Sequence, residues 1–191
     1  MRLTPIEKPA TLLAKIAYRS SKRRLGKVIT PLKVVFARVP KSLKAGYAIS
    51  KLVESGFSLD PELRFLVQTH VASINDCAFC VDIAKAVATH QGIDLDKCLT
   101  LPEYATSPLF TERERAALAY AEEATRNKRV ADATFTRLRE HFNDREIVEI
   151  TLLNAIENYY NLINLPLEIE SDGLCAIVRP RRVTKPAAIG K

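Results

Sequence analysis

The chain has 191 residues, of which 47% are hydrophobic and 27% are charged. This composition is typical of a globular domain with a substantial core, and it excludes an intrinsically disordered chain. There is no apolar run of about 18 residues and no pattern of a secretory signal, so we expect a cytoplasmic protein that needs no membrane.

The formal net charge of +7 is distributed unevenly along the chain. Residues 1–51 contain 13 basic side chains and one acid, whereas residues 52–178 contain 11 basic and 21 acidic side chains. We therefore divide the chain into a basic N-terminal arm or helix over 1–34, a helical domain over 35–175 and a basic tail over 176–191. The arm has few aromatic residues and no nucleic-acid module, so we expect it to lie on the acidic body of its own or a neighbouring copy.

Most of the chain has the period of amphipathic helices, and signals for strands are weak. In chain order, helices are predicted over 10–24, between Pro31 and Pro40, over 41–54, from the cap Asp60-Pro61-Glu62 to about Ala72, from the cysteines at 77–80 to Gly92, over 94–99, from the capping box at 111–114 to about Arg126, over 131–142, and from the cap at 143–146 to about Ile163. The tail from Gly173 is expected to be extended or loosely ordered. Short connections between the helices predict antiparallel neighbours in an all-α bundle.

The pair Cys77 and Cys80 follows the helix break at Asn75 and Asp76 and begins a new helix. The first turn of a helix has unpaired N–H groups and the positive end of the helix dipole, and both stabilise a thiolate. A spacing of three residues places the two sulfurs on the same side of the turn, where they can close a disulfide. The sequence therefore predicts a redox-active dithiol.

The alternatives for this pair are inert core cysteines and a structural zinc site, and the zinc site requires four ligands. The sequence contains no second Cys-x-x-Cys, Cys98 and Cys175 are isolated, and His70, His90 and His141 lie at no zinc-ligand spacing. We therefore expect no metal and no organic cofactor. Cys98 and Cys175 are interpreted as structural thiols, and His90 and His141 as surface residues near helix ends.

Two sequence motifs carry a family resemblance. The run LRFLVQTHVASINDCAFC over 63–80 and the helix FTERERAALAYA over 110–121 resemble the core signature of the alkylhydroperoxidase D-like, or carboxymuconolactone decarboxylase-like, family. The segments 135–150 and 154–164 are similar to the closing helix of that family, so that the resemblance covers about 35–175. It implies an all-α fold that assembles as a homo-oligomer, with a Cys pair that reduces hydroperoxides in the antioxidant members.

The sequence departs from this family at the proton relay. Peroxidatic members have a Glu twelve residues before the first Cys and a His four residues after the second, and here these positions are Phe65 and Ala84. Candidate substitutes are His70, Asp76 and Asp82. His70 has a pKa near neutrality and could act as a base, or it could pack on its helix or cap a carbonyl.

Two lines of reasoning predict different attacking sulfurs. The physics of a helix start favours Cys77, whereas the resemblance implies Cys80 as the peroxidatic cysteine and Cys77 as its resolving partner. We adopt the assignment that the resemblance implies, with Cys80, Cys77 and His70 as the catalytic set.

A polar stripe of Asn154, Asn158 and Asn161 lies on one face of the last long helix. We favour hydrogen bonding between helices or subunits for it over a role in lining an active-site cavity.

The leading functional hypothesis is a thiol-dependent antioxidant peroxidase of peroxiredoxin type. Its partners would be a small-molecule hydroperoxide, a dithiol protein or small thiol as reductant, and further copies of the chain. A carboxymuconolactone decarboxylase-type enzyme is the second hypothesis, and its turnover would not require the cysteines. A non-enzymatic redox sensor is the third, and the missing Glu and His favour it.

Overall fold

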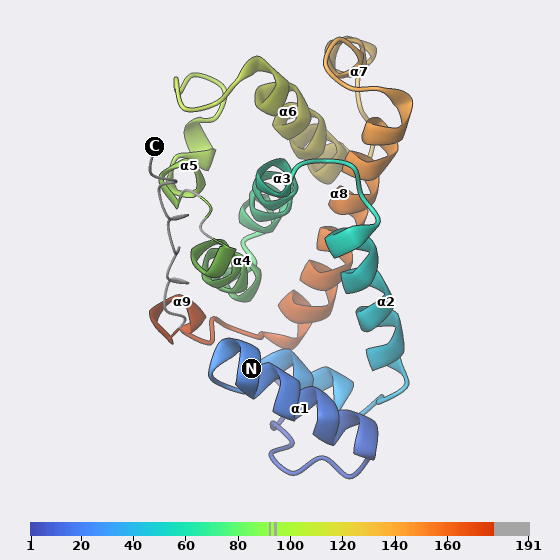
Figure 1. Ribbon diagram of the computed structural model, residues 1–191, viewed down its shortest axis with the longest axis vertical. Coiled ribbons are helices and arrows are strands. Elements are labelled where there is room, and N and C mark those ends of the chain that lie inside the picture. The colour runs from blue at the N-terminus through green and yellow to red at the C-terminus, as the bar shows by residue number, and fades with distance from the viewer. Residues whose placement is uncertain (92, 94, 178–191) are drawn as a thin grey trace, which may run out of the picture.

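The computed structural model describes residues 1–91, 93 and 95–177, and it confirms the predicted all-helical fold class (Figure 1). No strand occurs within these ranges. The α-helices are α1 (Leu12–Leu25), α2 (Ser42–Ser55), α3 (Pro61–Ile74), α4 (Ala78–Gln91), α5 (Leu95–Leu99), α6 (Glu112–Asn127), α7 (Asp132–Arg139), α8 (Asp144–Asn164) and α9 (Leu174–Ile177). The π-helix η1 (Leu32–Phe36) and the 3-10 helices η2 (Leu101–Glu103) and η3 (Leu165–Leu167) connect them.

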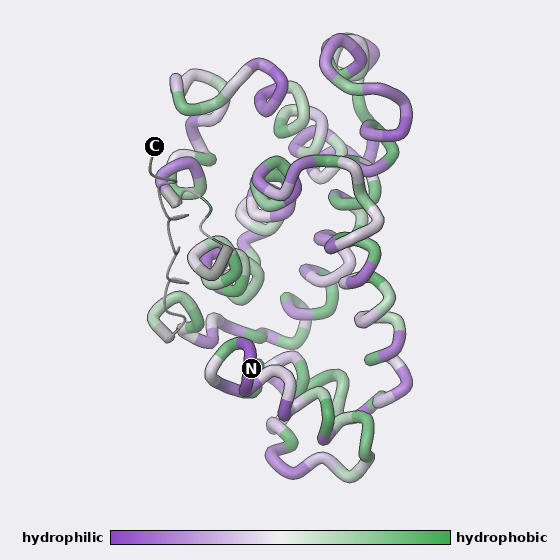
Figure 2. The backbone as a smooth tube through the Cα atoms, viewed as in Figure 1, coloured by the Kyte–Doolittle hydropathy of each residue, from purple (hydrophilic) through white to green (hydrophobic). Residues whose placement is uncertain are grey.

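Helix α3 is at the centre of the arrangement and packs against α4, α6 and α8. Helix α8 is the longest element, with 21 residues, and α9 lies against α4. In Figure 1 α7 is at the upper end of the molecule, and α1 crosses the lower end. Figure 2 shows that α4 is largely hydrophobic along its length, as expected for a helix in the interior. No helix in the described ranges is long and apolar enough to cross a membrane.

The predicted helix caps are confirmed. The carboxylate of Asp60 accepts a backbone N–H of the first turn of α3 at 2.8 Å. The side chains of Thr111 and Asn143 accept the backbone N–H groups of Glu114 and Glu146 at 3.2 and 3.0 Å. In return, each glutamate carboxylate accepts the backbone N–H of its cap residue. Each cap supplies about 1 kcal/mol, so local sequence fixes where α3, α6 and α8 begin.

Two predicted segments differ from the structure. The helix predicted over 131–142 ends at Arg139, because the N–H groups of His141 and Phe142 both turn back to the carbonyl of Leu138 and the Phe142 ring enters the core. The tail predicted to be extended or loosely ordered from Gly173 forms the short helix α9 instead. Gly92, Asp94 and the tail beyond residue 177 lie outside the described residues, as does the side chain of His90.

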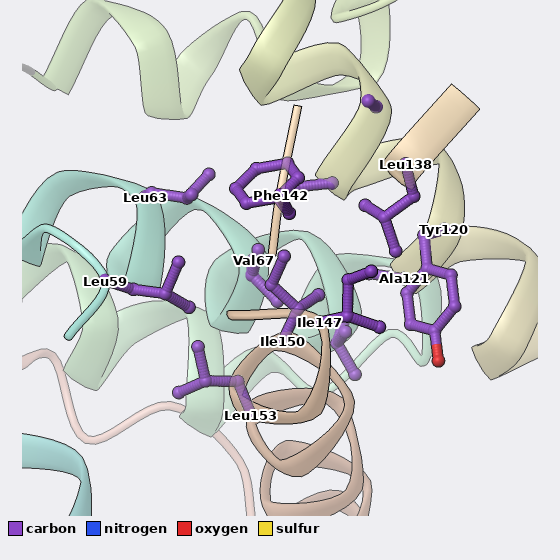
Figure 3. Close-up of a cluster of buried hydrophobic side chains, with 13 residues drawn as sticks. Leu59, Leu63, Val67, Tyr120, Ala121, Leu138, Phe142, Ile147, Ile150 and Leu153 are labelled. Atoms are coloured by element: carbon purple, nitrogen blue, oxygen red, sulfur yellow. The ribbon is translucent and has the colours of Figure 1, made fainter. Parts of the chain in front are cut away.

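The largest core cluster joins α3, α6 and α8, with Leu59 from the loop before α3 and Leu138 from α7 (Figure 3). Its buried side chains recur every three or four residues along one face of each helix. Examples are Leu63 and Val67 on α3 and Ile150 and Leu153 on α8. This cluster holds α8 against α3, and α8 carries the polar face described below.

A buried carboxylate anchors the loop between α2 and α3. Glu149 on α8 accepts hydrogen bonds from the N–H and hydroxyl of Ser58 and from the N–H of Leu59, and it pairs with Arg145. Burial alone would raise the pKa of Glu149, but the Arg145 contact and the backbone hydrogen bonds lower it to about 2. The ionised carboxylate is therefore the form that stabilises the fold.

We expect Glu149→Gln to lower the free energy of unfolding at neutral pH by about 1–2 kcal/mol, because the amide cannot accept all of these hydrogen bonds. The folded-state pKa is depressed, so this contribution is complete above the ordinary pKa of 4.5 and disappears as pH falls through about 2. Urea unfolding at a series of pH values measures it. If the difference in unfolding free energy between the wild type and Glu149→Gln stays constant down to that acidic range, the expectation is contradicted.

Candidate functional site

The turn between α3 and α4 places the cysteine pair. Asp76 has a left-handed backbone with φ of 53°, its N–H bonds to the carbonyl of Ser73 at 3.1 Å, and the N–H of Cys77 bonds to that of Ala72 at 2.9 Å. These two bonds form a Schellman motif, which ends α3 and reverses the chain. The carbonyl of Cys77 then accepts the N–H of Val81, so α4 begins directly after Cys77, as the sequence predicted.

Cys77 and Cys80 form a disulfide, with their Cα atoms 5.3 Å apart. The two side chains are buried, with only 1% and 5% of their surfaces exposed. The structure thus brings together the two residues that the spacing predicted as a pair. In the described part of the chain, no group of three or more His, Cys, Asp or Glu side chains is placed to hold a metal ion.

Two amide groups from α8 face the sulfur of Cys80. The Nδ2 atom of Asn161 donates to Cys80 Sγ at 3.1 Å, and that of Asn164 donates at 3.4 Å. Both asparagines are buried. Hydrogen bonds to a charged acceptor are stronger than those between neutral groups, so this pair of donors favours a thiolate at Cys80 over a thiol.

A ladder of amides orients the Asn161 donor. Asn154 Nδ2 donates to the backbone carbonyl of Ala121 at 2.9 Å, and Asn158 Nδ2 donates to the backbone carbonyl of Asn154 at 2.9 Å. Asn75 Nδ2 then donates to the Oδ1 atoms of Asn158 and Asn161 at 3.0 and 2.7 Å. Because a carbonyl can only accept, the ladder has one direction, and it turns the N–H groups of Asn161 towards the sulfur.

The same amide nitrogen of Asn161 also contacts a buried acid. Glu157 on α8 is 8% exposed, and its Oε1 atom accepts from Asn161 Nδ2 at 2.7 Å. Burial raises the pKa of Glu157 to about 7, and the hydrogen bond from Asn161 only partly offsets this. No ion pair to Glu157 is present among the residues that the structure describes.

Residues 47–123, which contain the turn and both cysteines, match the model of the carboxymuconolactone decarboxylase family. The uncharacterised protein YnjA of Escherichia coli (strain K12) is 33% identical over 186 residues, which cover 95% of this chain and 100% of YnjA. The chain belongs to the carboxymuconolactone decarboxylase family.

Solved structures agree with this family membership. ATU0492 from Agrobacterium tumefaciens, a protein of unknown function whose name points to the antioxidant defence protein AhpD, is 30% identical. The match covers 72% of this chain and 96% of ATU0492, with a TM-score of 0.67. The debrominase Bmp8 is 20% identical and has a TM-score of 0.79 over 91% of this chain and 94% of its own. These likenesses confirm the predicted alkylhydroperoxidase D-like helical fold.

The two positions at which the resemblance places the proton relay of peroxidatic members contribute to an apolar cluster in this chain. Phe65 is buried beside Leu66 and Leu118, and Ala84 packs against the same cluster. Cys98 lies there too, and burial raises the pKa of its thiol, in keeping with the structural role predicted for it. Cys175 is an exposed free thiol.

The structure places His70 with partners other than the cysteines. Its ring packs edge-on against Tyr104 with centroids 4.9 Å apart, and its Nε2 atom is 3.6 Å from Glu122 Oε2. Burial lowers the pKa of His70 below its ordinary value, although Glu122 acts in the opposite direction. Within the described residues, no hydrogen bond joins His70 to either sulfur, and its role as a base stays a prediction.

Asp82 anchors the C-terminal segment. Its carboxylate accepts the N–H groups of Asp172, Leu174 and Cys175 at 3.0, 2.9 and 3.0 Å, and the hydroxyl of Ser171 at 2.9 Å. Burial alone would raise the pKa of Asp82, but these hydrogen bonds lower it. They also explain why residues after Gly173 form α9, since Asp82 satisfies the first N–H groups of that helix. Asp76, the other candidate acid, is exposed in the turn.

Both ends of the described chain cover the disulfide. Val34 of η1, together with Ile169 and Leu174, packs in one buried cluster with the cysteine side chains. Asp172 joins the two ends, since its carboxylate accepts from the N–H of Thr30 at 2.7 Å and pairs with Lys27 at 3.0 Å. The basic arm thus lies on the acidic body of its own chain, as one of the two arrangements expected for it.

Sequence reasoning missed Glu157 and Asn164. Both continue the stripe that begins at Asn154, because residues 154, 157, 158, 161 and 164 follow one face of α8 at helical spacing. The hydrogen bonds between helices predicted for the stripe are confirmed by the Asn154 and Asn75 contacts, and the stripe also reaches Cys80. Five polar residues on one face of a helix rich in Ile and Leu were the available signal.

We expect Asp76→Gly to raise the free energy of unfolding by up to about 1 kcal/mol, because glycine adopts the left-handed conformation without steric cost. Asp76→Val should lower it by a similar amount, since a β-branched residue fits this conformation poorly. Urea unfolding of the oxidised protein measures both changes. A less stable glycine variant would show that the Asp76 side chain contributes more than its backbone conformation costs.

Proposed function

We propose that this protein is a thiol-dependent peroxidase in which Cys80 attacks and Cys77 resolves. The observation that carries the proposal is the pair of buried amide donors, from Asn161 and Asn164, directed at the sulfur of a cysteine that already forms a disulfide with its neighbour. The family membership and the likeness to ATU0492 support thiol chemistry at this site.

The proposed cycle consists of three steps. The Cys80 thiolate attacks the distal oxygen of a hydroperoxide, an S–O bond forms, the O–O bond breaks, and the leaving alkoxide takes a proton from water to give the alcohol. The Cys77 thiol then attacks the Cys80 sulfenic acid, forming the disulfide and releasing water. An external dithiol, as supplied in the cytoplasm, reduces the disulfide by exchange and is itself oxidised.

The amide donors favour Cys80 over Cys77 as the attacking sulfur. Cys77 is closest to the start of α4, where the helix dipole favours an anion. Side-chain hydrogen bonds nevertheless reach Cys80 and, among the described residues, none reaches Cys77. Hydrogen bonds to charged groups contribute about 1.5–3 kcal/mol each, so two of them exceed the contribution of up to about 2 kcal/mol that a dipole makes at a partly buried helix end.

The cover over the disulfide restricts what can react. With both cysteines at most 5% exposed, a small hydroperoxide fits better than a bulky one. The same burial favours the redox sensor as the second candidate function, because a covered pair would exchange slowly with a reductant. The decarboxylase alternative would be supported by turnover of a carboxylated lactone that does not depend on either cysteine.

The test is peroxide consumption with a dithiol reductant. Cys80→Ser should abolish both turnover and sulfenic acid formation. Cys77→Ser should stop turnover with the dithiol but leave a single round of sulfenic acid formation at Cys80, detected by dimedone labelling. His70→Gln, run in parallel, tests the predicted base. Peroxide consumption that survives Cys80→Ser and Cys77→Ser equally would sink the proposal and direct attention to the sensor or decarboxylase.

We further propose that the chain assembles as a homo-oligomer through the outer faces of α2 and α8. Helix α2 has no buried residue, and its Tyr47 is 67% exposed. On α8, Leu162 is 70% exposed, and Tyr159 and Leu165 on the same stretch of chain are also exposed. Several exposed large apolar side chains on neighbouring positions of a helix are typical of a protein–protein interface.

We expect Leu162→Lys to reduce the molar mass in solution towards that of a single chain, because a charge at a buried apolar interface is costly. Leu12→Lys on α1 is the matched control, since Leu12 is 74% exposed and belongs to neither α2 nor α8. Light scattering after gel filtration measures the mass. A wild-type protein that is monomeric at all concentrations would contradict the proposal.

A further inference from the structure

One amide nitrogen stands between a carboxyl group and a sulfur. Asn161 Nδ2 has two hydrogens, and it donates to Glu157 Oε1 at 2.7 Å and to Cys80 Sγ at 3.1 Å. The Oδ1 atom of Asn161 is occupied by the donor Asn75, so the amide cannot turn round without losing that bond. Glu157 and Cys80 are therefore joined through a fixed bridge.

We propose that Glu157 is a positioning residue that acts on Cys80 through the Asn161 amide, so that the two groups share a single negative charge when the disulfide is reduced. The inference deepens the proposed function, because it states how the reactive form of Cys80 is set. It concerns the reduced dithiol and holds for any chemistry that uses this thiolate.

The physical reason is like-charge repulsion in a buried site. A carboxylate at Glu157 and a thiolate at Cys80 would both accept from the same nitrogen, and both side chains are more than nine-tenths buried. Two anions so close and so poorly hydrated do not both form readily. Ionisation of one group therefore favours the protonated state of the other, and their titrations belong to the pair.

The surroundings leave this coupling uncompensated. On α8 the neighbouring titratable group is Tyr160, whose pKa burial and the charges of Tyr159 and Glu157 raise to about 12, so it stays neutral. Helix α3 contributes to the network the neutral amide of Asn75, and α4 contributes the sulfur itself. Among the described residues, no Lys, Arg or His pairs with Glu157.

In the reactive form, the proton is on Glu157 and the charge is on the sulfur. The amide donors of Asn161 and Asn164 favour this distribution, since each can donate to the thiolate. A neutral carboxyl group at Glu157 retains its hydrogen bond from Asn161 without repelling the charge. The acid thus sets the pH range over which Cys80 is a thiolate.

The test is the pH dependence of Cys80 alkylation. In the Cys77→Ser protein Cys80 stays reduced, and its reaction with iodoacetamide is followed at the Cys80 peptide by mass spectrometry from about pH 4 to about pH 10. We expect two steps in the rate profile. Adding Glu157→Gln should leave one step, with the upper midpoint lowered by about one to two pH units.

The matched control is Glu149→Gln, which removes another buried carboxylate of α8 that bonds Ser58 and Arg145 instead. Circular dichroism first verifies that each variant is folded, and the control should keep both steps. A two-step profile that survives Glu157→Gln, or a single step in the parent protein, overturns the inference.

A second measurement needs no change at Glu157. The carboxyl carbon of Glu157, followed by NMR in the wild-type protein, should titrate in one step when the pair is oxidised and in two steps when it is reduced. The same one-step curve in both states overturns the inference. Neither experiment uses a peroxide, so a protein that lacks peroxidase activity but shows the coupled titration would refute only the proposed function.

Discussion

The hydrogen bond from Asn161 to Cys80 is the contact on which the site depends. It joins α8, the longest helix, to the first turn of α4, and its direction is set by the backbone carbonyl of Asn154 through the amides of Asn158 and Asn75. The Schellman turn at Asp76 supplies the other requirement, because it presents both the Asn75 amide and the cysteine pair to α8. Among the described residues, ladder and turn together direct side-chain donors at the sulfur of Cys80 and not at that of Cys77.

Two aspartates bind the chain segments that cover this site. Asp82 holds the segment that becomes α9, and Asp172 in that segment holds the N-terminal arm through Thr30 and Lys27. Both contacts lie between parts of the chain far apart in sequence, so the cover exists only in the folded protein. The apolar residues that it contributes exclude water from the sulfurs, which strengthens every electrostatic interaction there.

Phe65 and Ala84 occupy the positions at which the sequence resemblance places a proton relay in peroxidatic members. Their apolar surroundings could not support a charge without a large desolvation cost. Glu157 on α8 is a titratable group that reaches Cys80 from another direction, through the Asn161 amide. His70 has its own acid partner in Glu122.

The sequence by itself determined the elements that depend on local chemistry. Helical period, the caps at Asp60, Thr111 and Asn143, and the spacing of the two cysteines are properties of a few neighbouring residues, and the structure agrees with each. Tertiary structure decided which side chains of different elements come into contact. The Asn stripe was visible as a pattern, but only the packing of α8 on α3 and α4 showed that it reaches a sulfur, because Asn161 and Cys80 lie 81 residues apart in the chain.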